Sequence, residues 1–159
     1  MLNFEGGWGC GIAWDPCNKY LICQTDNNSL VVWENTQQFG WHCRFTGNQT
    51  VSSDISEPVV KSSFFYRKVD FSPTGTSIVS TNMTLEGKPV SKLTTRDSFE
   101  HMLWFKGHLG NVYSARFHPK TIMTKSSKTS TTLLAIADSN GSLSIWAPKM
   151  RPIIIEEFL

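Results

Sequence analysis

One phrase of alternating residues occurs three times in this chain and constrains its fold more than any other feature. The copies occupy residues 11–16, 67–73 and 113–119. In each copy apolar or aromatic side chains alternate with other residues, and a proline stands two places after the last aromatic residue. Period-two alternation is typical of a strand with one buried face. Because proline has no N–H to donate to a sheet, it ends the strand and begins a turn.

A second phrase, found at residues 28–33 and 141–146, runs from Asn or Gly through Ser and Leu to a closing Trp. The Asn and Gly residues that precede it tolerate positive φ and indicate a hairpin turn. Further strands are predicted at 20–23, 77–80 and 133–137, and fourth strands at 40–45, 101–105 and 152–155. Each unit therefore reads as four short antiparallel strands.

Repeated four-stranded antiparallel units are typical of β-propeller blades, so we predict an all-β fold with about three blades. The units span approximately 8–45, 64–106 and 107–156. Two polar stretches, 46–61 and 121–132, are predicted to be inserted surface loops, the second of them mobile. We expect the side chains of Trp14, Phe71 and Phe117 to be buried between blades.

The composition supports a packed core and excludes several other classes of protein. Hydrophobic residues make up 40% and aromatic residues 12%, which is too many for a disordered chain. The net charge of +2 is too balanced to indicate nucleic-acid or membrane binding by charge alone. The four cysteines have no C-x-x-C spacing, so we interpret them as free thiols in a reducing compartment.

No catalytic or metal-binding motif is present, so we predict no enzyme, no catalytic residue, no metal site and no cofactor. The chain contains no G-x-S-x-G, P-loop or H-E-x-x-H motif. His42 and Cys43 are adjacent, but neighbours on a strand point to opposite faces and cannot form a nucleophile–base pair. The thiols of Cys10, Cys17 and Cys23 lack the paired spacing of zinc ligands.

The phrases resemble a known family. Gly107-His108 before a strand, with 142–146 closing the unit, resembles the WD repeat. The segments 14–33, 64–75 and 105–108 and the basic Arg-Pro tail at 149–155 resemble, in this order, the HIRA family of Hir-type histone regulators.

The resemblance implies a non-catalytic WD-repeat scaffold of a nuclear histone chaperone complex. It would act in replication-independent chromatin assembly and in transcriptional regulation, including repression. It would bind ubinuclein/Hpc-type subunits, and histones indirectly. No sequence-specific DNA, membrane or small-molecule ligand is expected. The alternatives are the WD-repeat subunit of chromatin assembly factor and an unrelated WD adaptor, for instance in ubiquitin ligation or RNA processing.

The resemblance also assigns structural WD-repeat positions. These are Trp14, Trp33, Phe71, His108, Phe117 and Trp146. A WD repeat usually has an Asp six residues before its closing Trp, where this chain has Asn27 and Asn140. We therefore expect the hydrogen-bonded tetrad around His108 to be weakened or absent.

Three residues are candidates for contact with a partner protein: Arg96, Trp41 and Trp104. For Arg96 the other interpretation is a local surface pair with Asp97 or Glu100, which would contribute little. The family's propeller is expected to have seven blades, so three units would form only part of a ring. We expect the open faces of the end blades to make the chain associate or dissolve poorly by itself.

Overall fold

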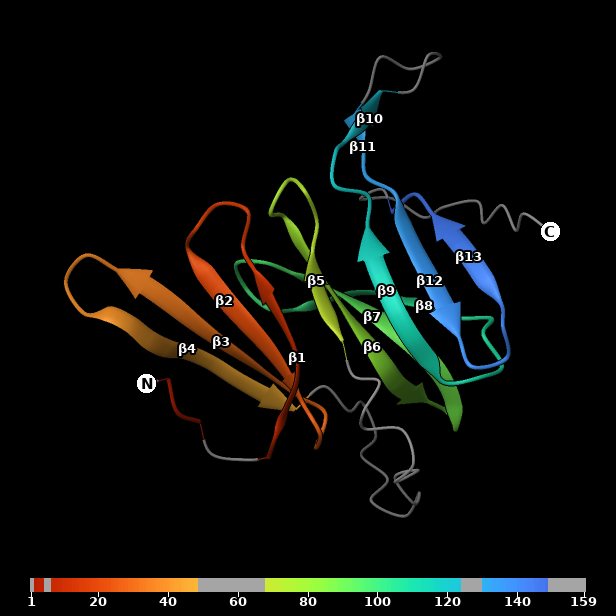
Figure 1. Ribbon diagram of the computed structural model, residues 1–159, viewed down its shortest axis with the longest axis horizontal. Helices are drawn as coiled ribbons and strands as arrows, with labels where there is room; N and C mark the ends of the chain where they lie inside the picture. Colours follow the sequence, from red (N-terminus) through yellow and green to blue (C-terminus); the bar gives the residue numbers. More distant parts are fainter. Residues whose placement is uncertain (1, 5–6, 49–67, 124–129, 149–159) are drawn as a thin grey trace.

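The computed structural model describes residues 2–4, 7–48, 68–123 and 130–148. Thirteen β-strands and no helix lie in this part of the chain. They form two four-stranded sheets, one three-stranded sheet and a separate two-stranded ribbon (Figure 1). The all-β expectation is therefore confirmed. None of the described segments is a helix that could cross a membrane.

The first two sheets are antiparallel meanders in which each strand pairs with the next one along the chain. Blade A consists of β1 (Gly9–Trp14), β2 (Tyr20–Thr25), β3 (Ser29–Thr36) and β4 (Gly40–Asn48). Blade B consists of β5 (Val69–Phe71), β6 (Ser77–Leu85), β7 (Lys88–Thr95) and β8 (His101–Phe105).

The third sheet, blade C, has three strands in the described residues, in the order β13-β12-β9. They are β9 (Val112–Phe117), β12 (Leu134–Asp138) and β13 (Leu143–Trp146). A short ribbon of β10 (Ile122–Met123) and β11 (Ser130–Thr131) follows β9 and precedes β12 in the chain. It stands away from the blade (Figure 1).

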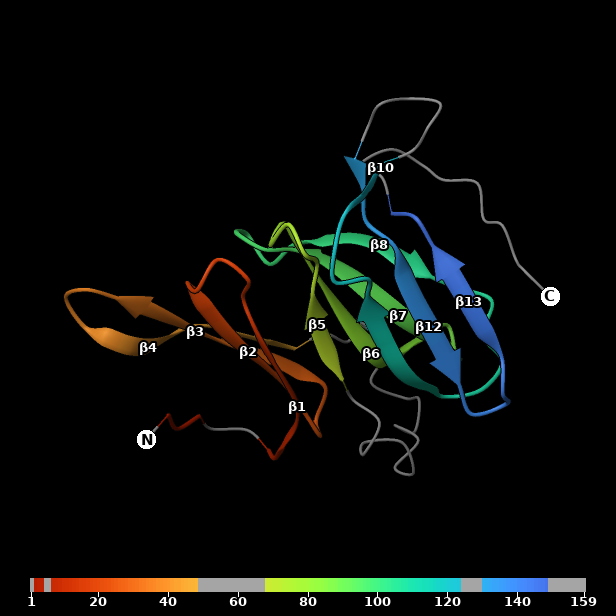
Figure 2. The same cartoon turned by 45° about the horizontal axis from the view of Figure 1, so that its top comes forward.

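The first strand of each blade is its inner strand. Strand β5 contacts both β1 and β9, and the three sheets fan out from these strands in both views (Figures 1 and 2). Successive four-stranded sheets arranged in this way are neighbouring blades of a WD-repeat β-propeller. The described residues form part of such a ring and do not close it.

Two apolar interfaces hold the three blades together. Alternation along β6 sends Ile78 into the interface with blade A and its neighbour Val79 into the interface with blade C. The first interface contains Tyr20, Ile22, Leu30, Val32, Val69, Phe71, Ile78 and Phe99. The second contains Val79, Leu93, Phe105, Val112, Ala115, Phe117, Leu134, Ile136 and Trp146. Each fully buried large side chain contributes roughly 1.5–3 kcal/mol to this stack.

The expectation that Trp14 is buried between blades is wrong, whereas Phe71 and Phe117 are buried at 5% and 8% exposure. Trp14 is 64% exposed. The register aligns it with Leu21 and Trp33 on the face of blade A that points away from blade B. Each of the three aromatic residues faces the preceding blade, and no described blade precedes blade A.

The inserted stretches also differ from expectation in part. Strand β4 continues to Asn48, because its residues go on pairing with β3, so the segment 46–61 is strand at its beginning. The stretch 121–132 contains the paired strands β10 and β11, whereas a mobile loop was expected throughout. The expected strand at 152–155, the start of the second unit at 64–67 and most of the first insertion lie outside the described residues.

Candidate interaction surfaces

The three proline phrases fold into turns that are organised by the residue before each proline. The Asp15 carboxylate accepts hydrogen bonds from three following backbone N–H groups at 3.0, 3.2 and 3.3 Å. The Ser72 hydroxyl accepts two, at 3.1 and 3.0 Å. In the third copy, Nδ1 of His118 lies 2.7 Å from the carbonyl oxygen and 3.2 Å from the backbone nitrogen of Lys120. Three different side chains thus perform the same local task, which is to satisfy the backbone of a tight turn.

Arg96 joins blade B to the first of these turns. Its guanidinium donates to Asp15 Oδ2 through Nη2 at 2.5 Å and through Nε at 3.2 Å. It also lies 4.9 Å from the centre of the Tyr20 ring, and Nη1 reaches Asp97 at 3.3 Å. The Asp15 side chain is fully buried and that of Arg96 is 15% exposed. The local pair with Asp97 therefore exists, but the main partner lies in another blade and was missed.

The electrostatics of Asp15 follow from this contact. Burial raises the pKa of the Asp15 carboxyl, but hydrogen bonds from Arg96 and from the turn backbone, with the charge of Arg96, outweigh burial and lower it. Arg96 in turn has a raised pKa: burial lowers it, and the bond and charge of Asp15 more than compensate. The pair is thus ionised and held by two charge-assisted hydrogen bonds to one carboxylate oxygen.

A looser version of the same contact joins blade B to blade C. Asp70 Oδ2 accepts the Phe117 N–H at 3.0 Å, and Oδ1 lies 3.5 Å from Nη1 of Arg116. Burial raises the pKa of Asp70, and the hydrogen bonds and Arg116 offset that effect only in part. Arg116 is 59% exposed, so its pair with Asp70 is weaker than the Arg96–Asp15 pair.

The proline turns meet at one end of the inner strands and border a hollow of about 210 Å³. Its walls are the aromatic and proline residues of all three copies, together with Asp70, Ser72 and His118. Trp14 forms the exposed side of this hollow and packs edge-on against Trp41, with ring centres 5.6 Å apart. Trp41 is half-buried and covers part of the outward face of blade A beside Trp33, which is buried.

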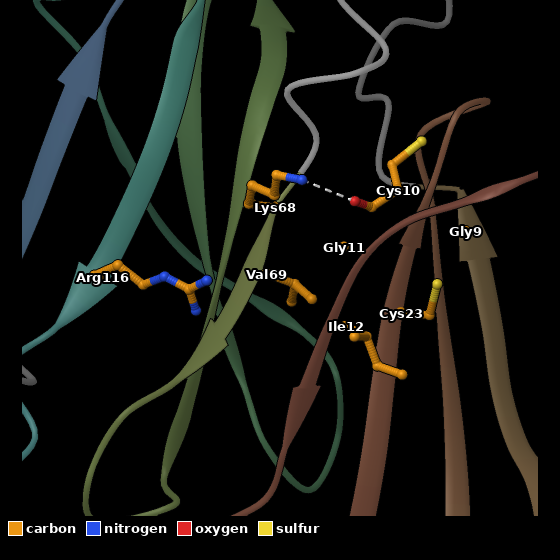
Figure 3. A pocket seen from close by; sticks show the side chains of 8 residues that line it. All are labelled: Gly9, Cys10, Gly11, Ile12, Cys23, Lys68, Val69 and Arg116. Carbon is orange, nitrogen blue, oxygen red and sulfur yellow. Dashed lines mark hydrogen bonds between the residues drawn. The ribbon is translucent and has the colours of Figure 1, made fainter.

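A second hollow, of about 420 Å³, lies between β1 and β5 (Figure 3). Its walls include Gly9, Cys10, Lys68 and Arg116. The Lys68 ammonium donates to the Cys10 carbonyl at 3.1 Å, so it joins the two inner strands. Arg116 extends from blade C towards the same space in Figure 3 and pairs with Asp70 on the way. Both cations therefore bond to a neighbouring blade and help to hold the stack together.

The WD tetrad is intact in blade C, so the expectation of a weakened tetrad is wrong. His108 Nδ1 lies 3.0 Å from Asp138 Oδ2, and His108 Nε2 lies 2.7 Å from Ser144 Oγ. The Trp146 indole N–H donates to the same Ser144 oxygen at 2.6 Å. The carboxylate comes from Asp138, which stands two residues before Asn140. Four residues, 139–142, separate Asp138 from β13, so Asp138 stands eight places before Trp146, and counting back six places selects Asn140 instead.

Asp138 also organises the β12–β13 turn. Burial alone would raise the pKa of Asp138, but hydrogen bonds from Ser142, His108, Asn140 and Gly110 outweigh burial and lower it. Blade A has no carboxylate at the equivalent place, where Thr25 bonds Asn27 and Ser29 instead.

Trp104, the third sequence-derived contact candidate, lies in β8, at the outer edge of blade B. It is half-buried, and its ring lies against His101 with centres 4.6 Å apart. Blade B has a neighbouring blade on each side, so the exposure of Trp104 is not caused by an open end of the stack.

Within the described ranges no three His, Cys, Asp or Glu side chains gather as a metal ion would require.

Comparison with known proteins shows that the chain is similar to histone regulators. It is 26% identical over 161 residues to Protein HIR1 of Cryptococcus neoformans, across 97% of this chain and 17% of that protein. It is 28% identical over 147 residues to Protein hir1 of Schizosaccharomyces pombe, across 91% of the chain and 14% of the relative. Histone transcription regulator slm9 of the same yeast is 28% identical over 138 residues, or 86% of the chain and 15% of the relative.

No family model matches the chain. The chain spans less than a fifth of the length of these curated relatives. The alignments nevertheless cover 86–97% of the chain. The resemblance carried by those phrases is confirmed, and the chain is a relative of the Hir1-type histone regulators.

Proposed function

We propose that this chain is a non-catalytic WD-repeat scaffold of a HIRA-like histone chaperone complex in the nucleus. It would serve replication-independent chromatin assembly and transcriptional regulation. The observation that carries the proposal is its similarity to Hir1 proteins and to a histone transcription regulator over 86–97% of its length. A stack of antiparallel blades with intact interfaces presents rigid surfaces to other subunits, which is how propellers are commonly used.

The proposed contact with a partner is the outer edge of blade B around Trp104. Half-buried tryptophans are frequent anchors of protein interfaces, because a large ring buries much area at little entropic cost. Trp41 lies on the outward face of blade A, and we assign it to the contact with a further blade. Arg96 has its charge engaged by Asp15, so its proposed role is to hold two blades together.

The partner expected at this edge is a ubinuclein/Hpc-type subunit, with histones bound indirectly. The experiment is affinity purification of the tagged chain from nuclear extract, followed by mass spectrometry and blotting for these proteins. The Trp104→Ala variant should lose most of the ubinuclein-type subunit. Trp8→Ala is the matched control, because Trp8 is 76% exposed and lies immediately before β1 of blade A. Thermal melting of both variants checks that they remain folded.

The outcomes separate the proposal from its alternatives. Co-purification of histones and a ubinuclein-type subunit, lost in Trp104→Ala and kept in Trp8→Ala, would support it. Recovery of chromatin assembly factor subunits would instead favour the WD-repeat subunit of that factor. Recovery of ubiquitin-ligase or RNA-processing proteins without histones would favour an unrelated adaptor, and the proposed function would then be wrong.

A further inference from the structure

Lys92 is a buried cation that has no counter-charge among the residues described by the structure. It lies in the middle of β7, and the whole residue is only 7% exposed. No carboxylate of the described residues pairs with it, and its one polar contact is with the Trp104 ring, whose centre is 5.6 Å from Nζ. Burial lowers the pKa of the Lys92 ammonium accordingly. Lysine is rarely buried unless it is paired, because an uncompensated charge in an apolar setting is costly.

Other unpaired polar groups lie on the same face of blade B. The register places Ser80 and Trp104 directly opposite Lys92 on the two neighbouring strands. Thr94 follows two residues later on the same side of β7. The hydroxyls of Ser80 and Thr94 are buried and have no hydrogen-bond partner. Such groups are rare in folded proteins, and each calls for a physical explanation.

The stem of Lys92 is buried, but its ammonium is not completely enclosed. Among the described residues four fully enclosed side-chain oxygens lack a partner, and Lys92 Nζ is not one of these enclosed, unpaired atoms. Beside it, the exposed His101 and half-buried Trp104 form an aromatic wall at the outer edge strand β8. Lys92, His101 and Trp104 together are called the Lys92 site below.

We propose that the Lys92 site binds an aspartate or glutamate side chain from an acidic segment of a partner protein. A single cation in an apolar setting favours one carboxylate, and the aromatic wall suits the short apolar stem of such a side chain. A nucleic acid requires a row of cations that follows its phosphates, which this site lacks. The inference deepens the proposed function by naming the chemistry of the blade B edge, and its test is independent of histone regulation.

The test titrates the full 159-residue chain with N-acetyl-hexaglutamate amide, and with hexaglutamine as the uncharged probe. Binding is followed by NMR, with the His101 ring as reporter. Burial and the neighbouring Lys92 charge both lower the pKa of His101. A carboxylate bound at Lys92 offsets that charge, so hexaglutamate should raise the pKa of His101 and hexaglutamine should not. The Lys92→Met and Lys88→Met variants complete the set, because Lys88 is an exposed lysine in the same strand.

We expect Lys92→Met to weaken hexaglutamate binding by about 10- to 100-fold, the usual effect of losing a charged hydrogen bond. Lys88→Met should leave the affinity for hexaglutamate within about twofold of the wild-type value. In the absence of peptide, Lys92→Met should also unfold at a higher urea concentration, because it removes an unpaired buried charge.

Three results would overturn the proposal. The first is an unchanged pKa of His101 at millimolar hexaglutamate. This measurement needs only the wild-type chain. The second is equal weakening by both methionine variants, which would indicate diffuse charge attraction. The third is a lower urea midpoint for Lys92→Met, which would mean that the chain itself already satisfies the ammonium.

Discussion

Replacing Arg96 by Met should destabilise the blade stack more than any other single change of a surface-reaching charge. The substitution keeps most of the aliphatic stem and removes the guanidinium that bonds Asp15 twice, at 2.5 and 3.2 Å. The Asp15 side chain is fully buried, so it cannot turn to water when its partner is lost. The variant would therefore retain a buried carboxylate without its cation.

The magnitude follows from what remains around that carboxylate. Removing one member of a buried ion pair typically costs about 3–5 kcal/mol. Asp15 would keep three backbone N–H donors, so the lower end of that range applies, and we expect about 3 kcal/mol. At about 2 kcal/mol per molar urea, the unfolding midpoint should fall by about 1.5 M. This is a large share of the roughly 5–15 kcal/mol that stabilises a domain.

The assay is urea unfolding followed by tryptophan fluorescence, with a double-mutant cycle through Asp15→Asn. Arg116→Met is the matched control, because its pair with Asp70 is longer at 3.5 Å and Arg116 is 59% exposed. Its cost should stay below about 1 kcal/mol. Equal costs for the two arginine variants, or a coupling energy near zero between Arg96 and Asp15, would refute the reasoning.

Three other results are expected. The pKa of Asp138 is lowered in the folded state, so its ionised carboxylate stabilises the fold fully above the unfolded pKa of about 3.9. This stabilisation is lost as the pH falls through the folded pKa. In pH-dependent urea melts, the difference in stability between wild type and Asp138→Asn should therefore close below about pH 4. Phe71→Ala should cost about 3–5 kcal/mol by urea unfolding, whereas Trp14→Ala, 64% exposed, should cost about 1 kcal/mol. Gly75→Ala should lower the thermal midpoint by the equivalent of about 1–2 kcal/mol or more, because Gly75 has φ +69° and an added Cβ would lie 2.8 Å from Cys17 Sγ.

The architecture of the blades could be predicted from local patterns in the sequence. The alternation before each proline predicts the inner strands β1, β5 and β9. The Asn and Gly turns predict the β2–β3 and β12–β13 hairpins. These patterns are local, because a strand with one buried face needs only its own residues to show it. The same patterns identify Phe71 and Phe117 as interface residues.

Contacts that depend on three-dimensional placement could not be predicted in the same way. Arg96 and Asp15 are 81 residues apart, and no local pattern joins a β7–β8 turn to a β1–β2 turn. Asp138 was missed because it stands eight residues before Trp146, two more than the six that simple counting assumes. Lys92 reads in the sequence as an ordinary polar residue of an alternating strand, and only the fold shows that no carboxylate of the described residues pairs with it.

The exposure of Trp14 shows how position in the stack decides what a repeated residue does. Trp14, Phe71 and Phe117 occupy the same place in three copies of one phrase, and each faces the blade before it. The faces of blades B and C are covered by their neighbours, but the corresponding face of blade A leaves Ile12 and Trp14 63% and 64% exposed. On the outward face of blade C, Leu143 is 61% exposed. The residues of these two faces therefore have the composition of an interface. Blade B is covered on both sides, so the partial exposure of half-buried groups such as Trp104 has a cause other than an open blade face.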